Sequence, residues 1–303
     1  MTPAIRHVVA ATDFSEPAGW AVARAARICA EHRARLTLVH VLNHDWMDAL
    51  RGWLGSEAGW SQRMLETAQS QLAEEAAGLQ QRFGVAVQPQ VIDGQPVAAI
   101  GQLAHDQQAD LLVVGVHGTS PVRHWIIGTT AERLLRLAQL PLLMVRQAPK
   151  DGYRLALVPV DFSAWSAAAT GWAQAVAPHA QWVLAHTFTV PFEEKLRFAG
   201  VDAATIDLYR DKARRAALSQ LEALVAAQAD VADRYSLCLR EGDAAPAMVQ
   251  EAQDRGCDLV VIGKHGRNAA EELLLGSVTR HLLAEAPCDV MVSTQRADLP
   301  PLG

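Results

Sequence analysis

The stretch ADLLVVGVHG at residues 109–118 returns as CDLVVIGKHG at residues 257–266, and the rest of the chain is organised around these two copies. In each copy an acidic residue precedes four large aliphatic side chains, and a glycine ends the run. A short, unbroken aliphatic run is typical of a strand buried on both faces of a parallel sheet. Each copy is therefore expected to form such a strand, with a glycine-containing loop at its carboxyl end.

The repeat extends well beyond these strands. The tripeptide DFS at residues 13–15 returns at 161–163, with the same shift of 148 residues that relates the two glycine loops. A register held from an early strand to a late helix indicates duplicated domains, because the repeats of solenoid proteins are far shorter. The Pro-Lys-Asp-Gly stretch at 149–152 is typical of a linker. We therefore expect one domain at 1–148 and a second at 153–296.

Strand and helix patterns alternate in each half, which predicts an α/β fold with a parallel sheet and helices on both faces. Ser15 is expected to cap the first helix, and Pro17 suits its first turn. In the first half, strands are expected at 8–12, 36–42, 85–92, 111–115 and 142–145, and helices at 15–30, 61–83, 96–107 and 129–138. In the second half, strands are expected near 155–160, 182–187, 235–240, 258–263 and 289–292.

Composition and charge exclude several classes of protein. Half of the 303 residues are apolar and a fifth are charged, as in a globular chain of two domains. Residues 1–150 carry 13 basic and 13 acidic side chains, and residues 151–303 carry 14 and 20, so neither half has the basic excess of a nucleic-acid-binding protein. No run approaches the ~18 apolar residues of a membrane span, and no secretory signal is visible. We expect a cytoplasmic protein.

The four cysteines lack a CxxC pairing and are expected to be buried thiols in a reducing compartment.

A second motif follows the repeated strand in each half and has the form G-x-x-G-x9-G-[ST]. It comprises Gly115, Gly118, Gly128 and Thr129 in the first half, and Gly263, Gly266, Gly276 and Ser277 in the second. Glycine at a strand end permits positive φ and close approach of a ligand to the backbone. The helix that starts after the last glycine would offer free N–H groups and a positive dipole end to a phosphate group. The motif therefore predicts two phosphate-binding sites.

Asp13 and Asp161 follow the first strand of each domain, beside the switch point where open α/β sheets bind ligands. A carboxylate there could accept a hydrogen bond from a ribose or hold a phosphate-bound Mg²⁺. The alternative is structural, because Asp-x-Ser is also a good helix start.

These motifs together resemble the universal stress protein family, as two UspA-type domains in tandem. The resemblance covers about residues 4–148 and 153–294 and is carried by the DFS tripeptides, the glycine motifs and LTLVHVL at 36–42. It implies two Rossmann-like domains, each a five-stranded parallel sheet of order 3-2-1-4-5 with helices on both faces. The family's nucleotide-binding branch shares the glycine motif, which implies that the motif contacts the ribose and phosphates of ATP.

The resemblance also implies individual site residues. Adenine would lie against the backbone at the end of the second strand, near Val41 and Thr187. The implied nucleotide-binding residues are Asp13, Val41, Gly115, His117, Gly118, Gly128, Thr129, Thr130, Asp161, Thr187, Gly263, His265, Gly266, Arg267, Gly276, Ser277 and Val278. The expected ligand is ATP, ADP or AMP, and a requirement for Mg²⁺ is left open.

Some positions depart from the family's pattern. A basic residue often follows the second glycine of the motif, and Arg267 fits this whereas Thr119 does not. Glu271 and Glu272 would repel a triphosphate if they faced it, and Trp125 stands where small aliphatic residues are usual. On balance the second site is favoured, for Arg267 and Ser277.

The function expected from this pattern is regulation in a stress response rather than fast catalysis. The chain has no GxxxxGK[ST] and no GxSxG, so any hydrolysis of ATP should be slow. A slow ATPase or a metal-assisted hydrolase is one alternative, the latter because four histidines fall near the ends of strands. They are His40, His117, His186 and His265. No HExxH spacing supports a metal site, and satisfied or solvent-facing histidines are favoured.

The other alternative is an interaction scaffold without nucleotide. The halves differ at 43–60, which carries three tryptophans, and at 188–204. These segments could be lids or partner surfaces, although helices packed on the sibling domain are favoured. As in resembling proteins, the two domains are expected to pair about a pseudo-twofold axis through the strands at 142–145 and 289–292. A homodimer with an unidentified protein partner is expected.

Overall fold

The computed structural model describes residues 2–43, 60–116, 129–137, 140–190, 192–266 and 275–297. The chain divides into two compact units. Unit 1 comprises Met1–Gly152 with Cys288–Gln295, and unit 2 comprises Tyr153–Pro287 with Arg296–Gly303. The last strand of the second repeat is thus counted with unit 1.

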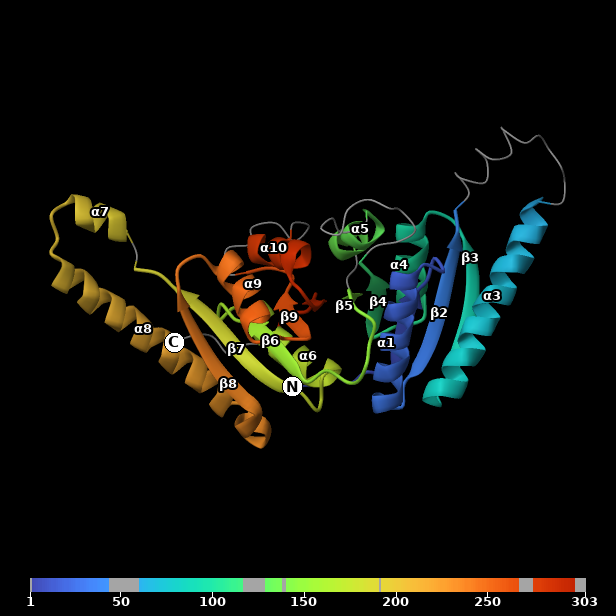
Figure 1. Cartoon of the computed structure of the whole chain (residues 1–303), viewed down its shortest axis with the longest axis horizontal. Coiled ribbons are helices and arrows are strands. Elements are labelled where there is room, and N and C mark those ends of the chain that lie inside the picture. The colour runs from blue at the N-terminus through green and yellow to red at the C-terminus, as the bar shows by residue number, and fades with distance from the viewer. Residues whose placement is uncertain are drawn as a thin grey trace. The chain divides into compact units, whose positions relative to one another are not determined.

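Unit 1 contains the parallel sheet that the sequence predicted. Its strands are β1 (His7–Ala11), β2 (Arg35–Leu42), β3 (Val87–Asp93), β4 (Leu111–Gly115) and β5 (Leu142–Val145). They lie in the order β3-β2-β1-β4-β5, which is the expected order 3-2-1-4-5 (Figure 1). A sixth strand, β10 (Asp289–Ser293), pairs antiparallel with β5, so the two strands expected to meet lie side by side.

The helices of unit 1 are α1 (Glu16–His32), α3 (Trp60–Phe83), α4 (Pro96–Asp106) and α5 (Thr129–Leu137). The sequence-based reading of α1 is confirmed, because the Ser15 hydroxyl accepts a hydrogen bond from the Ala18 N–H and Pro17 stands in the first turn. The helix ends at Arg33, which adopts a left-handed backbone conformation. The buried face of α1 includes four residues at the predicted helical spacing, namely Ala21, Ala25, Ile28 and Cys29.

Unit 2 repeats this arrangement. Its strands are β6 (Leu155–Pro159), β7 (Gln181–Phe188), β8 (Tyr235–Glu241) and β9 (Leu259–Gly263), in the parallel order β9-β6-β7-β8. The helices are α6 (Ala164–Val176), α7 (Glu193–Phe198), α8 (Ala203–Ala226), α9 (Ala244–Asp254) and α10 (Ser277–Glu285), with a 3-10 turn at Ala229–Arg234. Helix α8 packs along β7 and β8 (Figure 1). Helix α7 falls in the 188–204 segment, where the sequence favoured a helix, whereas the 3-10 turn was not predicted.

The acidic residue before each repeated strand has a structural role at the opposite edge of the sheet from the glycine loops. The Asp110 carboxylate accepts the backbone N–H groups of Arg6 and His7, at 2.7 and 2.9 Å. Asp258 accepts those of Arg154 and Leu155, at 2.9 and 3.0 Å. Because the first strand of each repeat enters the sheet there, these carboxylates satisfy N–H groups that the sheet leaves unpaired.

Strand β10 is held in unit 1 by a buried ion pair. The guanidinium of Arg24 on α1 lies 3.6 Å from the Asp289 carboxylate, and the two side chains are 8% and 3% exposed. Asp289 also accepts the backbone N–H of Arg146 at 2.8 Å, and Arg24 donates to the backbone carbonyl of Asp151 at 2.8 Å. The pair therefore joins α1, β10 and the segment that follows β5.

The four cysteines are buried free thiols, as expected. Burial raises the pKa of Cys29 to about 12 and that of Cys257 to about 11, which makes both thiols poor nucleophiles.

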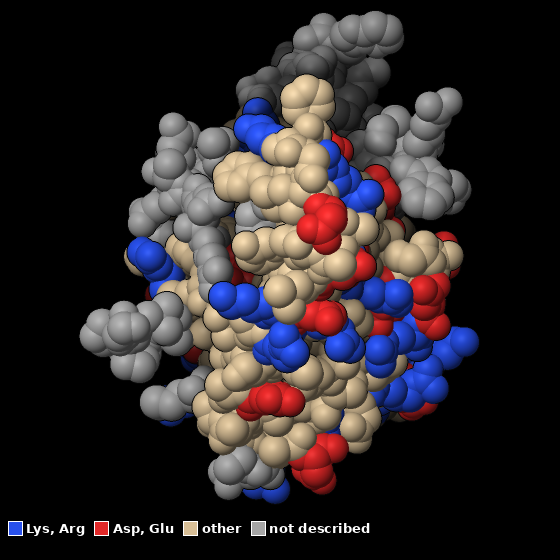
Figure 2. All heavy atoms as spheres, turned by 90° about the vertical axis from the view of Figure 1, so that its left-hand side faces the viewer, with Lys and Arg blue, Asp and Glu red and all other residues tan. Residues whose placement is uncertain are grey.

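Among the described residues, no helix has both the length and the apolar character that a membrane span requires. Figure 2 shows the side of unit 2 that carries α7 and α8, where acidic and basic side chains are interspersed.

Candidate functional site

The DFS tripeptide makes the turn from the first strand to the first helix in unit 1. The Asp13 side chain accepts the backbone N–H of Ser15 at 3.1 Å, and Phe14 between them has a φ of 62°. A left-handed conformation is unusual for a residue with a bulky side chain. Asp13 is half-buried, so the turn holds its carboxylate at the carboxyl edge of the sheet.

The same turn recurs in unit 2 with an additional contact. The Asp161 carboxylate accepts the backbone N–H of Ser163 at 3.1 Å and the Ser163 hydroxyl at 2.6 Å, and Phe162 again has a φ of 62°. Ser163 in turn accepts the N–H of Ser166 and caps α6. Both aspartates therefore organise a helix start, which is the structural role that the sequence left open.

A phenylalanine and a histidine pack together beside each turn. The rings of Phe14 and His40 lie 4.5 Å apart, and His40 Nδ1 is 2.9 Å from the Thr12 carbonyl. In unit 2 the rings of Phe162 and His186 are also 4.5 Å apart, and His186 Nδ1 is 2.7 Å from the Val160 carbonyl. Since a carbonyl only accepts, Nδ1 is the protonated nitrogen in both rings.

The described residues include no group of three His, Cys, Asp or Glu side chains that could hold a metal ion. His117, the fourth histidine of the metal hypothesis, lies outside them.

The first glycine of each motif is explained by packing. A Cβ on Gly115 would lie 2.9 Å from the Pro17 carbonyl oxygen, and one on Gly263 would lie 2.8 Å from Trp165 Cβ. Neither glycine has a positive φ, so the left-handed backbone that glycine permits is not used at these positions. These glycines instead allow the first turn of α1 or α6 to approach the strand end closely.

The later glycines of the second motif converge on one another. The Gly276 N–H donates to the Lys264 carbonyl at 3.0 Å, and a Cβ on Gly276 would lie 3.7 Å from the Gly266 nitrogen. The Thr279 hydroxyl donates to the Gly263 carbonyl at 2.9 Å. The start of α10 is thereby fixed against the loop that leaves β9.

Asp161 lies against this loop. A Cβ on Gly266 would lie 2.9 Å from Asp161 Oδ2. The acidic turn after the first strand and the glycine loop after the fourth therefore meet in unit 2, as the sequence predicted for residues 105 positions apart. The Asp161 carboxylate, the backbone of Gly266 and the start of α10 therefore lie side by side.

Other predicted residues of the second site surround this junction to different extents. Ser277 is exposed and Val278 is half-buried in the first turn of α10. Thr187 is half-buried near the end of β7. His265 is only 4% exposed, and its ring meets the Trp165 ring edge-on at 4.6 Å, so its side chain serves the packing of α6 on the loop.

The first site is described only in part. Val41 is half-buried near the end of β2, and Thr130 is exposed at the start of α5. The side chain of Thr129, the segment 117–128 and the segment 267–274 lie outside the description. The predictions for His117, Gly118, Gly128 and Arg267 fall there, as do those for Thr119, Trp125, Glu271 and Glu272.

Two residues that the sequence did not single out lie near these turns. In unit 2 it is Trp165, which stands where unit 1 has Pro17. In unit 1 it is Glu75 of α3, a half-buried carboxyl close to the Thr12 side chain beside the DFS turn. The sequence does not distinguish Glu75 from the adjacent Glu74, because both lie on a mostly polar helix. Desolvation raises the pKa of Glu75 above its ordinary value.

Glu75→Gln is expected to stabilise the protein at neutral pH. A carboxyl whose pKa is raised on folding disfavours the folded state once pH exceeds its unfolded pKa, and this penalty disappears at lower pH. The melting temperature should rise by about 1–2 °C at pH 7, and the gain should vanish as pH falls below the ordinary range of a glutamate. Differential scanning calorimetry from pH 4 to 8 measures this, with the exposed neighbour Glu74→Gln as control. An unchanged or lower melting temperature at pH 7 contradicts the prediction.

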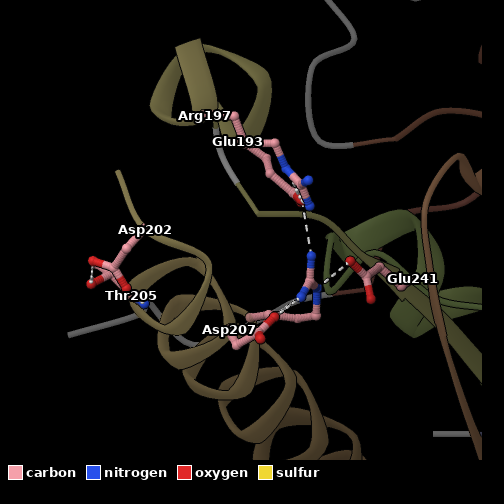
Figure 3. Close-up of polar contacts among 7 residues, drawn as sticks. Glu193, Arg197, Asp202, Thr205, Asp207 and Glu241 are labelled. Atoms are coloured by element: carbon pink, nitrogen blue, oxygen red, sulfur yellow. Dashed lines mark hydrogen bonds and ion pairs between the residues drawn. The ribbon is translucent and has the colours of Figure 1, made fainter. Parts of the chain in front are cut away.

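Helix α7 lies in the 188–204 segment that differs between the repeats. Arg210 of α8 pairs with Glu193 of α7 at 2.9 Å, with Glu241 at the end of β8 at 2.7 Å, and with Asp207, and Figure 3 shows these carboxylates converging. Phe198, at the end of α7, is 96% exposed. The helix contains no buried residue, and the Glu193–Arg210 ion pair joins it to α8. A role as lid or partner surface stays a prediction.

Solved structures with a similar fold include two universal stress proteins, one of them putative. A universal stress protein of Archaeoglobus fulgidus has a TM-score of 0.67 and 16% identity, covering 94% of this chain and 97% of that one. A putative universal stress protein of Pseudomonas aeruginosa has a TM-score of 0.61 and 18% identity, covering 95% and 93%. At these identities the likeness concerns the fold.

Sequence comparison identifies the family. Universal stress proteins of Mycobacterium tuberculosis and Mycobacterium bovis are each 25% identical over 306 residues, covering 95% of this chain and 97% of theirs. The model of the universal stress protein family matches residues 4–146 and again residues 152–294. Since these two matches span nearly the whole sequence, the chain belongs to the universal stress protein family and contains two of its domains in tandem.

Proposed function

We propose that this universal stress protein binds an adenine nucleotide, ATP in the first instance, and acts as a regulatory protein. The observation that supports this is the junction of Asp161, Gly266 and Gly276 in unit 2. Because Gly266 has no side chain, a ligand can approach the backbone N–H groups beside the Asp161 carboxylate. The adjacent start of α10 favours negative charge, as a phosphate requires.

The proposed role of each residue in this site follows from the chemistry of its side chain. The half-buried Asp161 carboxylate can accept a hydrogen bond from a ribose hydroxyl, and Ser277 is exposed to donate its hydroxyl to a phosphate oxygen. In this proposal the adenine would lie near Thr187 at the end of β7, as the family resemblance implies. The repeated DFS turn and strand order support a corresponding site in unit 1, formed around Asp13 and Val41.

Turnover at such a site should be slow. Phosphoryl transfer requires charge stabilisation at the γ-phosphate, and Lys264, the lysine within the second motif, is buried, at 8% exposure. We therefore propose that binding, rather than hydrolysis, is the biochemical event. Nucleotide would shift the affinity for a protein partner or for a second copy of the chain in a homodimer, a coupling that is reciprocal.

The test is to denature freshly purified protein and identify any released small molecule by mass spectrometry, with its stoichiometry per chain. Two adenine nucleotides per chain would support both sites, and one would support a single occupied repeat. No released nucleotide, no uptake of added ATP and no thermal stabilisation by ATP would contradict the proposal and favour a nucleotide-free scaffold. Rapid phosphate release by the purified protein would instead favour the ATPase or hydrolase alternative.

A further inference from the structure

We propose that Arg296, close to the carboxyl end of the chain, supplies a positive charge to the anionic part of the ligand at the second glycine motif. The inference rests on the proposed function. Residues 294–297 follow β10, and the Ala297 N–H donates to the Ala164 carbonyl in the first turn of α6 at 2.9 Å. This bond fixes the tail at the helix start that follows the Asp161 turn.

Arg296 is placed next to the glycine loop through one side chain. Its guanidinium lies over the Trp165 ring, 5.3 Å from the ring centroid. Trp165 packs closely on Gly263 and meets the His265 ring edge-on at 4.6 Å. The tail, the first turn of α6 and the loop leaving β9 are thus in successive contact, and the guanidinium is exposed at the outer end of this series.

The electrostatics of this position favour an anion. The start of α6 carries the positive end of the helix dipole, where a cationic side chain is unfavourable unless negative charge lies nearby. The tryptophan face offsets part of that cost through a cation–π contact. Asp161 contributes one negative charge, and its Oδ1 already accepts two hydrogen bonds from Ser163. A phosphate bound at the neighbouring motif would add further negative charge and so favour the cation at this position.

The first repeat lacks this arrangement. With the shift of 148 residues, Arg296 corresponds to Ala148 and Trp165 corresponds to Pro17. Neither the cation nor the aromatic ring that supports it is present there. The two sites should therefore differ in preference, with the second site favouring a polyphosphate over an uncharged nucleoside.

The experiment compares ATP with adenosine in the full-length chain by isothermal titration calorimetry at low salt. Arg296→Gln should weaken ATP binding at one site by about 3–10-fold and leave adenosine binding unchanged, because the exposed charge acts on the phosphates. Arg296→Lys, which keeps the charge, should restore most of the affinity. The difference should shrink in 0.5 M salt, where exposed charges are screened.

Two controls separate this inference from the proposed function. Arg154→Gln makes the same charge change at an exposed arginine (side chain 84% exposed) at the opposite edge of the unit 2 sheet, and should have no effect on ATP affinity. In a Gly266→Asp background, Arg296→Gln should cause no further loss. Wild-type protein that binds no nucleotide overturns the proposed function. Wild-type binding with an unaffected Arg296→Gln variant, or equal losses for ATP and adenosine, overturns this inference alone.

Discussion

Replacing Asp289 by alanine is expected to lower the free energy of unfolding of unit 1 by about 3–5 kcal/mol, the usual cost of leaving one partner of a buried ion pair alone. Arg24 is 8% exposed at its side chain and would lose the Asp289 carboxylate while keeping its bond to the Asp151 carbonyl. The backbone N–H of Arg146 would also lose its acceptor. A fall of about 10 °C in melting temperature should follow.

Urea denaturation followed by circular dichroism measures the overall loss, and hydrogen-exchange mass spectrometry locates it. Peptides from β5 and β10 should lose protection first, whereas peptides from β7 and β8 of unit 2 should keep theirs. Glu132→Ala is the matched control, because its pair with Arg136 at 2.8 Å is exposed and separated by four residues, and should contribute about 0.3–0.5 kcal/mol. Equal, small effects of both substitutions would contradict the assigned role of Asp289.

The parallel sheet was predictable because each strand carries its own signal. Leu111–Gly115 is buried on both faces and therefore consists almost entirely of aliphatic residues, which distinguishes it from a surface helix by local pattern alone. The Ser15 cap and Pro17 are likewise local signals, and α1 begins where they indicate. Strand boundaries shifted by one or two residues, as at β3, which starts at Val87 instead of residue 85, because strand ends lack such markers.

The contacts between distant segments were not predictable. Arg24 and Asp289 come from different repeats, and the shift of 148 residues places Trp172 and Pro141 at the corresponding positions, so no repeated pattern pointed to the pair. The packing role of Gly263 depends on Trp165, and no local sequence pattern places that residue beside it. Arg296 lies beyond the last predicted strand, and a single arginine in a polar tail carries no signal of the ring it covers.

Gly266→Asp is expected to abolish nucleotide binding at the second site, lowering its affinity by at least about 100-fold. The new Cβ would lie 2.9 Å from Asp161 Oδ2, so the added carboxylate would stand against an existing one and beside the start of α10. Like charges at such short range in a partly buried site repel strongly, and a bound phosphate would meet a second carboxylate beside that of Asp161. The released-nucleotide assay should show the loss of one equivalent per chain if both sites are occupied in the wild type.

Two further variants separate the effect of the added charge from the effect of the added side-chain volume and from a loss of folding. Gly266→Ala adds the Cβ without the charge and should retain partial binding, because the Asp161 side chain can shift by a few tenths of an ångström. Gly78→Asp introduces the same charge at an exposed position on α3 with no atom within 4 Å, and should bind nucleotide like the wild type. Circular dichroism and the melting temperature establish that each variant is folded. A folded Gly266→Asp protein that retains the wild-type stoichiometry and affinity would remove the second glycine motif from the proposed site, and would redirect the search to Asp13 and Val41 in unit 1.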